Sequence, residues 1–174
     1  NLNVFDSSEE KTSKIENVFA MDIITNTGTL NIEDILLENR KSENYVITNN
    51  GTLALNNSAI NCINGINNFG DSDLKNTNIQ ASTTAISNSG TLVVNGGEIV
   101  GGSYALYSSS NTTENIENTT LSSSNNAIYK TSTSNMIVKN TSVLGNVTNT
   151  GSGNLSLKVE NIEGNFVNTG NVTL

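Results

Sequence analysis

The chain has 174 residues and a formal net charge of −8, with no His, no Pro, no Trp and one Cys, whereas Asn, Ser and Thr number 33, 21 and 21. The lack of His and the single Cys exclude Ser-His-Asp and Cys-His catalytic systems, His-ligated zinc and an internal disulfide framework. The acidic balance, with one Arg, argues against a nucleic-acid partner, and no apolar run approaches the roughly 18 residues of a membrane-spanning helix.

A five-residue pattern recurs along the chain: an apolar residue, a small polar residue, Asn, any residue and Gly. Its six copies span residues 24–28, 47–51, 66–70, 86–90, 147–151 and 166–170. Glycines of neighbouring copies lie 19 to 23 residues apart, and the 61 residues from Gly90 to Gly151 match three degenerate units. Leu106 to Ser108 and Ile128 to Lys130 occupy the places of the two missing copies. A fixed period of about 20 residues indicates a solenoid.

Each unit contains short apolar segments with period two, such as Leu92 to Val94 and Ile99 to Val100, divided by Asn, Gly and Ser. This alternation is typical of strands, and no unit has room for a helix. A unit of this size buries its apolar face only against its neighbours, stacked at about 4.8 Å. We therefore predict an all-β, right-handed parallel β-helix of about 7–8 coils with three short strands per coil. A leucine-rich repeat is the alternative architecture, but its convex-side segment has no counterpart here.

The whole of residues 1–174 is expected to form one domain, in which residues 1–50 make longer coils with charged insertions and residues 51–174 make regular coils. The insertions are residues 6–14 and 38–43, and nine of the 16 acidic residues fall in the first 43. Charge runs of this kind are usually solvated loops. A short helix is the alternative for the first insertion, because Ser7 and Glu10 have the spacing of a capping box.

Two acidic pairs are the candidates for chemistry. Asp71 and Asp73 lie on an expected turn and are the candidates for a metal site, and Glu114 and Glu117 form a second pair. Paired carboxylates can divide acid and base roles or bind calcium, yet neither pair is joined by a His or by further acids. We interpret both pairs as solvated, and we predict no catalytic residue, no bound metal and no cofactor.

Tyr107 and Tyr129 follow the apolar residue of the pattern in consecutive units, at a position that is polar in most other units. We therefore expect them to face outward as a stacked aromatic strip, with Lys130 beside them. Such a strip can bind a sugar or a protein, and it can equally serve as a ladder that stabilises neighbouring coils.

The Asn of the pattern is expected to be structural. Asparagines stacked at one corner can pass amide hydrogen bonds from coil to coil. The column consists of Asn26, Asn49, Asn68, Asn88, Asn149 and Asn168.

The runs Ala85 to Leu92 and Ile47 to Leu53 resemble the repeats of right-handed parallel β-helix surface proteins of bacteria, which include autotransporter passenger domains and pectate-lyase-like adhesins. The resemblance implies a secreted or surface-displayed adhesin or stalk whose partner is a protein or glycan on a host or neighbouring cell. Three alternatives stay open: a polysaccharide lyase or hydrolase, a self-assembling fibre subunit, and an ice-binding solenoid. Both ends of the chain fall inside the repeat, so we expect a segment of a longer solenoid or end-to-end self-association.

Overall fold

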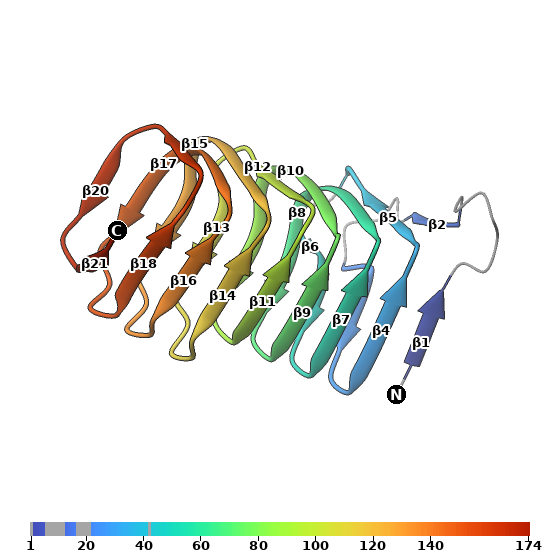
Figure 1. The fold of residues 1–174 in the computed structure, drawn as a ribbon. Helices are drawn as coiled ribbons and strands as arrows, with labels where there is room; N and C mark the ends of the chain where they lie inside the picture. Colours follow the sequence, from blue (N-terminus) through green and yellow to red (C-terminus); the bar gives the residue numbers. More distant parts are fainter. Residues whose placement is uncertain (1, 6–12, 17–21, 42) are drawn as a thin grey trace.

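The structure, a computed structural model, describes residues 2–5, 13–16, 22–41 and 43–174, which form a rod of stacked coils (Figure 1). The described residues contain 21 β-strands and no helix, and all of the strand pairs are parallel. About eight coils of roughly 20 residues follow one another, which confirms the predicted β-solenoid. In Figure 1 the chain rises along the near strands, descends along the far ones and advances from N to C in a right-handed sense. No helix in the described part of the chain is long and apolar enough to cross a membrane.

The first sheet contributes one strand to every coil and runs the length of the rod (Figure 1). Its nine strands, in spatial order, are β1 (Leu2–Phe5), β4 (Thr29–Glu33), β7 (Thr52–Asn56), β9 (Asp71–Lys75), β11 (Thr91–Asn95), β14 (Glu114–Glu117), β16 (Met136–Lys139), β18 (Asn154–Lys158) and β21 (Asn171–Thr173).

The second sheet has twelve strands and forms the other two sides of each coil. In half of the coils these sides are separate strands, namely β2 (Lys14–Glu16) and β3 (Ile24–Asn26), β5 (Leu36–Asn39) and β6 (Tyr45–Asn49), β12 (Glu98–Gly101) and β13 (Tyr104–Ser108), and β19 (Asn161–Glu163) and β20 (Phe166–Asn168). In the others they merge into one long strand, as in β8 (Ala59–Asn68), β10 (Asn78–Asn88), β15 (Thr120–Lys130) and β17 (Ser142–Asn149). The third strand of a coil means hereafter β3, β6, β13, β20 or the second half of a merged strand.

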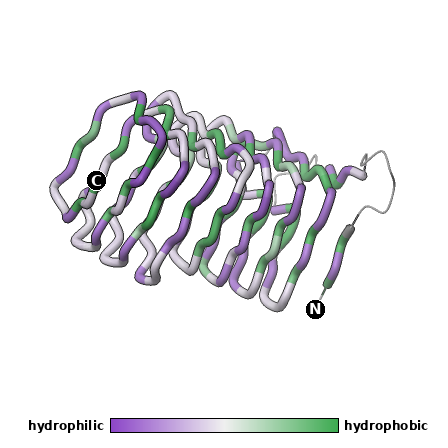
Figure 2. The backbone as a smooth tube through the Cα atoms, in the orientation of Figure 1, coloured by the Kyte–Doolittle hydropathy of each residue, from purple (hydrophilic) through white to green (hydrophobic). Residues whose placement is uncertain are grey.

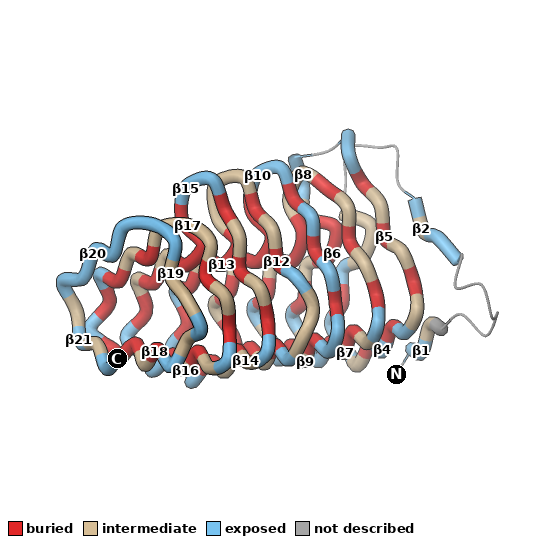
Figure 3. Tube along the Cα trace, turned by 45° about the horizontal axis from the view of Figure 1, so that its top comes forward, coloured by how far each residue is buried: buried red, intermediate tan, exposed pale blue. Residues whose placement is uncertain are grey.

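The register brings the predicted repeats together. Ile86 pairs with Ile66 on one side and Leu106 on the other, and Leu106 pairs in turn with Ile128. The degenerate units between Gly90 and Gly151 therefore stack in step with the regular ones. Apolar residues recur at the same points of successive coils (Figure 2), and the matching buried bands run along the rod (Figure 3). These side chains form one continuous core.

The Gly of the repeat pattern allows coils to approach closely. A Cβ added to Gly51 would lie 2.1 Å from the carbonyl oxygen of Gly28, and one added to Gly70 would lie 2.1 Å from that of Gly51. Neither distance is possible for a real Cβ, so a side chain at these positions would push the stacked backbones apart. The glycine is required by close approach of the backbone rather than by its φ angle.

A second asparagine column turns four of the coils from the first sheet into the second. Its members have φ between 45° and 54°, the left-handed region that Asn tolerates better than most residues. They are Asn57, Asn76, Asn118 and Asn140. A Ser or Thr follows each of them, and the Thr77 hydroxyl, for example, donates to the carbonyl of Lys75 at 3.1 Å.

The described parts of the charged insertions lie near the N-terminal end of the rod. Most of residues 6–14 falls outside the described residues, so its solvated-loop and helix interpretations stay untested there. Lys14–Glu16, at its end, forms strand β2 and pairs with β5. Beside it, Lys14 and Arg40 both contact the carboxylate of Glu38. These two cations hold the pKa of Glu38 below its ordinary value, with the Lys14 hydrogen bond as the larger cause.

Candidate binding surface

Three tyrosines gather on the outer side of the third strands. Tyr107 and Tyr129 are register partners, and their rings stack with centroids 5.7 Å apart and planes 10° from parallel. Tyr104 joins them edge-on, with its centroid 5.6 Å from that of Tyr107 and 5.5 Å from that of Tyr129. All three side chains are half-buried. This tyrosine cluster (Tyr104, Tyr107 and Tyr129) is the main aromatic feature of the described surface.

The sequence alone did not identify Tyr104 as a member. In a straight strand, residues three apart point to opposite faces, so period two separates Tyr104 from Tyr107. In β13 the two residues between them, Ala105 and Leu106, are both buried. The local bend that buries two consecutive residues turns both tyrosines outward.

Lys130 is placed inside the solenoid, so the expectation that it lies beside the tyrosines on the surface is wrong. It is fully buried, in register with Ser108 and Asn149 of the neighbouring coils. Its Nζ donates to the carbonyl of Ser132 at 2.8 Å and to that of Gly153 at 3.2 Å. Burial lowers the pKa of Lys130, and the nearby Glu114 partly opposes this shift.

The asparagine column forms an internal ladder of amide hydrogen bonds. Each Nδ2 donates to the Oδ1 of the next coil: Asn26 to Asn49 at 2.7 Å, Asn49 to Asn68 at 2.8 Å, and Asn68 to Asn88 at 2.7 Å. The same Nδ2 also donates to the carbonyl of the pattern's Gly, as Asn49 does to Gly51 at 3.1 Å. A second segment of the ladder lies near the C-terminal end, where Asn149 Nδ2 donates to Asn168 Oδ1 at 2.8 Å. The ladder therefore satisfies polar groups that burial would otherwise leave without partners.

Between the two segments of the ladder, Ser108 and Lys130 occupy the Asn position, and the carboxylate of Glu114 joins them. Glu114 is fully buried, and it accepts hydrogen bonds from Asn88 Nδ2 and from the Ser108 hydroxyl, both at 2.6 Å. Burial raises the pKa of Glu114, although both hydrogen bonds and the Lys130 charge oppose this shift. Asn149 Oδ1, which would receive the next amide, is buried and has no hydrogen-bond partner among the described residues.

The two acidic pairs are arranged differently. Asp71 and Asp73 share the outer face of β9, where Asp73 contacts Lys75 at 2.8 Å, next to a shallow hollow of about 270 Å³ over Ala54. The described residues contain no group of three or more potential acidic or Cys metal ligands. Glu114 is buried, whereas Glu117 is half-exposed and pairs with Lys139 at 2.8 Å, so the structure does not bring the second pair together.

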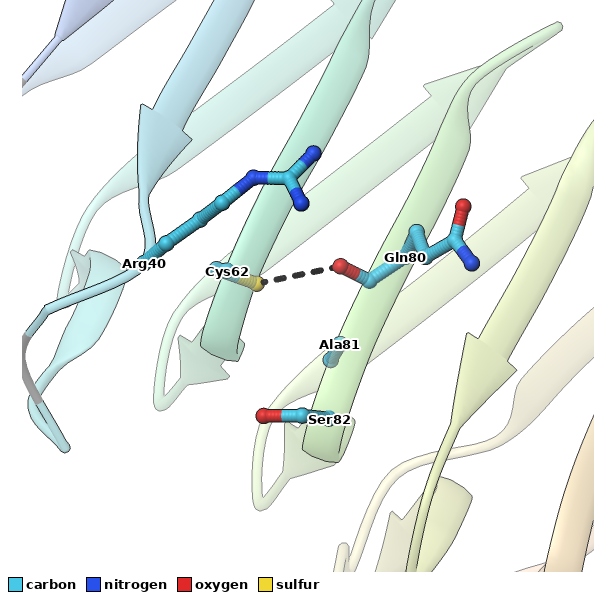
Figure 4. Close-up of a pocket in the computed structure, with 5 residues that line it drawn as sticks. All are labelled: Arg40, Cys62, Gln80, Ala81 and Ser82. Atoms are coloured by element: carbon cyan, nitrogen blue, oxygen red, sulfur yellow. Dashed lines mark hydrogen bonds between the residues drawn. The ribbon is translucent and has the colours of Figure 1, made fainter.

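A further hollow of about 270 Å³ lies at the side of the second sheet, around Arg40, Cys62 and Gln80 (Figure 4). The Cys62 thiol packs against the core and contacts the carbonyl oxygen of Gln80 at 3.8 Å. Burial raises the pKa of Cys62 to about 12, and the Arg40 charge opposes this shift only in part. A thiol with so high a pKa is a poor nucleophile, so this hollow offers little chemistry.

Comparison of the chain with protein-family models, with curated proteins and with solved structures finds no match in any of the three. The parallel β-solenoid is therefore established by the structure itself, and the resemblance to bacterial surface proteins contributes only to the proposal that follows.

Proposed function

We propose that this chain is a non-enzymatic, secreted or surface-displayed bacterial adhesin or stalk, which presents a binding surface on a stiff solenoid. The observation that carries the proposal is the tyrosine cluster, an aromatic surface fixed on the outer side of stacked strands. Stacked coils with one continuous core suit a role in which a binding surface is held at a distance.

The arrangement of the charged groups supports a non-enzymatic role. Catalysis by paired carboxylates needs two acids with different pKa values that face one cleft. Asp71 and Asp73 lie on an open sheet face, and one of them is paired with a Lys. Glu114 has the raised pKa of a general acid, but it is fully buried and both of its oxygens accept hydrogen bonds within the core. A substrate would have to open the solenoid to reach it.

The proposal is tested by attachment of the purified chain to bacterial and host cells, measured by flow cytometry with a fluorescent label. We expect attachment by the wild-type chain and its loss in a variant in which Tyr104, Tyr107 and Tyr129 are all replaced by Ser. The matched control is Tyr45→Ser, because Tyr45 is half-buried and occupies the same outward column as Tyr104. Release of reducing ends from a panel of polysaccharides, or attachment unaffected by the triple substitution, would contradict the proposal.

A further inference from the structure

We propose that the tyrosine cluster is a binding site for an uncharged, hexose-based oligosaccharide. This inference rests on the proposed function and adds the chemical class of the ligand. The argument depends on three properties of the cluster: which ring faces remain open, which hydroxyls remain unpaired and which charges lie around it.

The stack leaves one face of each of its two rings open to a ligand. Because Tyr107 and Tyr129 are register partners on neighbouring coils, their stack runs along the rod, and each ring covers one face of the other. The next residue in this outward column is Ser87 beyond Tyr107 and Thr148 beyond Tyr129. Both are too short to cover a ring. The flat C–H face of a sugar can therefore pack against either outer ring face.

The cluster also has free hydrogen-bonding groups. The three phenolic hydroxyls form no hydrogen bond with any other described residue, and each can donate and accept one. Neighbouring polar side chains are already oriented: Thr148 donates to Asn126 Oδ1 at 2.8 Å, and the hydroxyls of Ser89 and Ser109 lie 3.0 Å apart. A rigid apolar platform bordered by hydroxyls matches a sugar, which presents both C–H faces and hydroxyl groups.

The surroundings are uncharged over four consecutive coils. The segments around the third strands, residues 82–90, 102–113, 122–138 and 145–157, contain one charged residue, Lys130, which is buried, and Glu114, which accepts a hydrogen bond from Ser108, is likewise buried, so no charged side chain faces solvent here. A charged partner, such as an acidic glycan or a highly charged protein surface, would lose hydration here without gaining an opposite charge. A neutral sugar loses little hydration free energy on binding, so the electrostatics of this surface favour a neutral sugar.

The small area of the tyrosine cluster also limits the size of the partner surface that it can contact. A stable protein–protein interface covers about 800 Å² on each partner and centres on a well-packed apolar core. The tyrosine cluster is three residues surrounded by Ser, Thr and Asn, which is closer to the footprint of a few sugar units. We therefore favour a glycan over a protein partner, and protein binding becomes an outcome of the test.

The experiment measures binding of the full chain to an array of neutral oligosaccharides, made of glucose, galactose or mannose units, and to sialylated and uronic-acid oligosaccharides. We expect binding to at least one neutral class, with little change between low and high salt because no charges pair. Replacing Tyr107 and Tyr129 together by Ser should weaken this binding by about tenfold or more, since two stacking surfaces are lost. Tyr45→Ser should bind like wild type.

A second variant keeps the test decisive if the double tyrosine substitution disturbs folding. Ser87→Arg combined with Thr148→Arg leaves every tyrosine in place but covers the outer faces of both Tyr107 and Tyr129 with long side chains, and it should also weaken binding. Circular dichroism and thermal unfolding establish that each variant is folded. Binding restricted to acidic glycans, neutral-glycan binding unchanged by the combined Ser87→Arg and Thr148→Arg substitutions, or no glycan binding at all would overturn the inference. Cell attachment that survives removal of neutral glycans by glycosidases would overturn it and leave the proposed adhesin role intact.

Discussion

Asn49 donates from its Nδ2 to the Oδ1 of Asn68, in the next coil, at 2.8 Å, and both side chains are fully buried. Asn68 in turn donates to Asn88 at 2.7 Å and accepts a bond from the Ser72 hydroxyl at 2.8 Å. Each amide of this ladder thus depends on the coils before and after it. Such a network costs most when one member is removed, because the remaining members stay buried without partners.

The ladder predicts a large effect of Asn68→Ala on stability. The substitution removes one acceptor of Asn49 Nδ2, the amide donor to Asn88 Oδ1 and the acceptor of the Ser72 hydroxyl, so we expect a loss of at least about 2 kcal/mol in the free energy of unfolding. Urea unfolding followed by circular dichroism measures it. Asn67→Ala is the matched control, since Asn67 is the adjacent, half-buried residue on the outer side, and it should cost less than about 0.5 kcal/mol. Equal losses in the two variants would contradict a structural role for the ladder.

The close approach of coils predicts opposite outcomes for two glycines of the same pattern. Gly70→Ala would place a Cβ 2.1 Å from the carbonyl oxygen of Gly51, so it should destabilise the chain by several kcal/mol, about 3 or more, or prevent folding. Gly28→Ala meets no atom of the described residues within 4 Å and should be neutral or slightly stabilising, because Ala restricts the unfolded chain. Thermal unfolding of the two variants measures the difference. Similar melting temperatures would show that the coils can separate without cost.

The period and the register of the solenoid could be predicted from sequence because both depend on local patterns. The six copies of the repeat place Asn and Gly at the same corner of six coils, and Leu106 and Ile128 keep the apolar position in the two coils where Asn and Gly are lost. The second asparagine column also left a signal that went unused, namely the recurring Asn followed by Ser or Thr at positions 57, 76, 118 and 140.

The composition of the candidate site was harder to predict. Tyr104 faces outward only because β13 bends, and the two-residue alternation of a regular strand does not predict such a bend. Lys130 occupies the Asn position of the pattern, but lysine is so seldom fully buried that the surface was the natural expectation. Glu114 stands two residues before the core residue Ile116, so alternation alone would place it inside. In both cases the position in the repeat predicts burial better than the residue type does.

Burial of Glu114 predicts an unusual dependence of stability on pH. The pKa of Glu114 is raised in the folded chain, so above the ordinary value of about 4.3 the folded state holds more protons than the unfolded state. The contribution of Glu114 to stability therefore falls as the pH rises through this window. The side chains that face it are Asn88, Ser108 and Lys130.

Comparison with Glu114→Gln isolates this contribution. The variant keeps a side chain that can accept from Asn88 but cannot ionise, and all other titrating groups are shared with the wild type. We expect the two proteins to have similar unfolding free energies near about pH 4 and the variant to become the more stable one toward about pH 8. Urea unfolding at a series of pH values measures the difference. A difference that stays constant, or that grows in favour of the wild type as the pH rises, would contradict the raised pKa.

The asparagine ladder is interrupted at Ser108 and Lys130. We predict that restoring an amide at position 130 can stabilise the chain. Lys130 Nζ donates to Ser132 O and Gly153 O, much as Asn26 Nδ2 donates to Gly28 O at 3.2 Å and Thr52 O at 2.9 Å. An asparagine at this position could make the same two bonds and also donate to the unpaired Oδ1 of Asn149.

Lys130→Asn combined with Glu114→Gln should therefore match or exceed the wild type in unfolding free energy, because two buried ionisable groups are exchanged for amides that carry no charge. Lys130→Met should instead lose about 3–5 kcal/mol, since it removes the Nζ donor from the carbonyls of Ser132 and Gly153 and leaves Glu114 without a nearby cation. Urea unfolding at neutral pH compares the three proteins. If the double variant proved as unstable as Lys130→Met, the buried charges would be essential to this coil and not a substitute for the amide ladder.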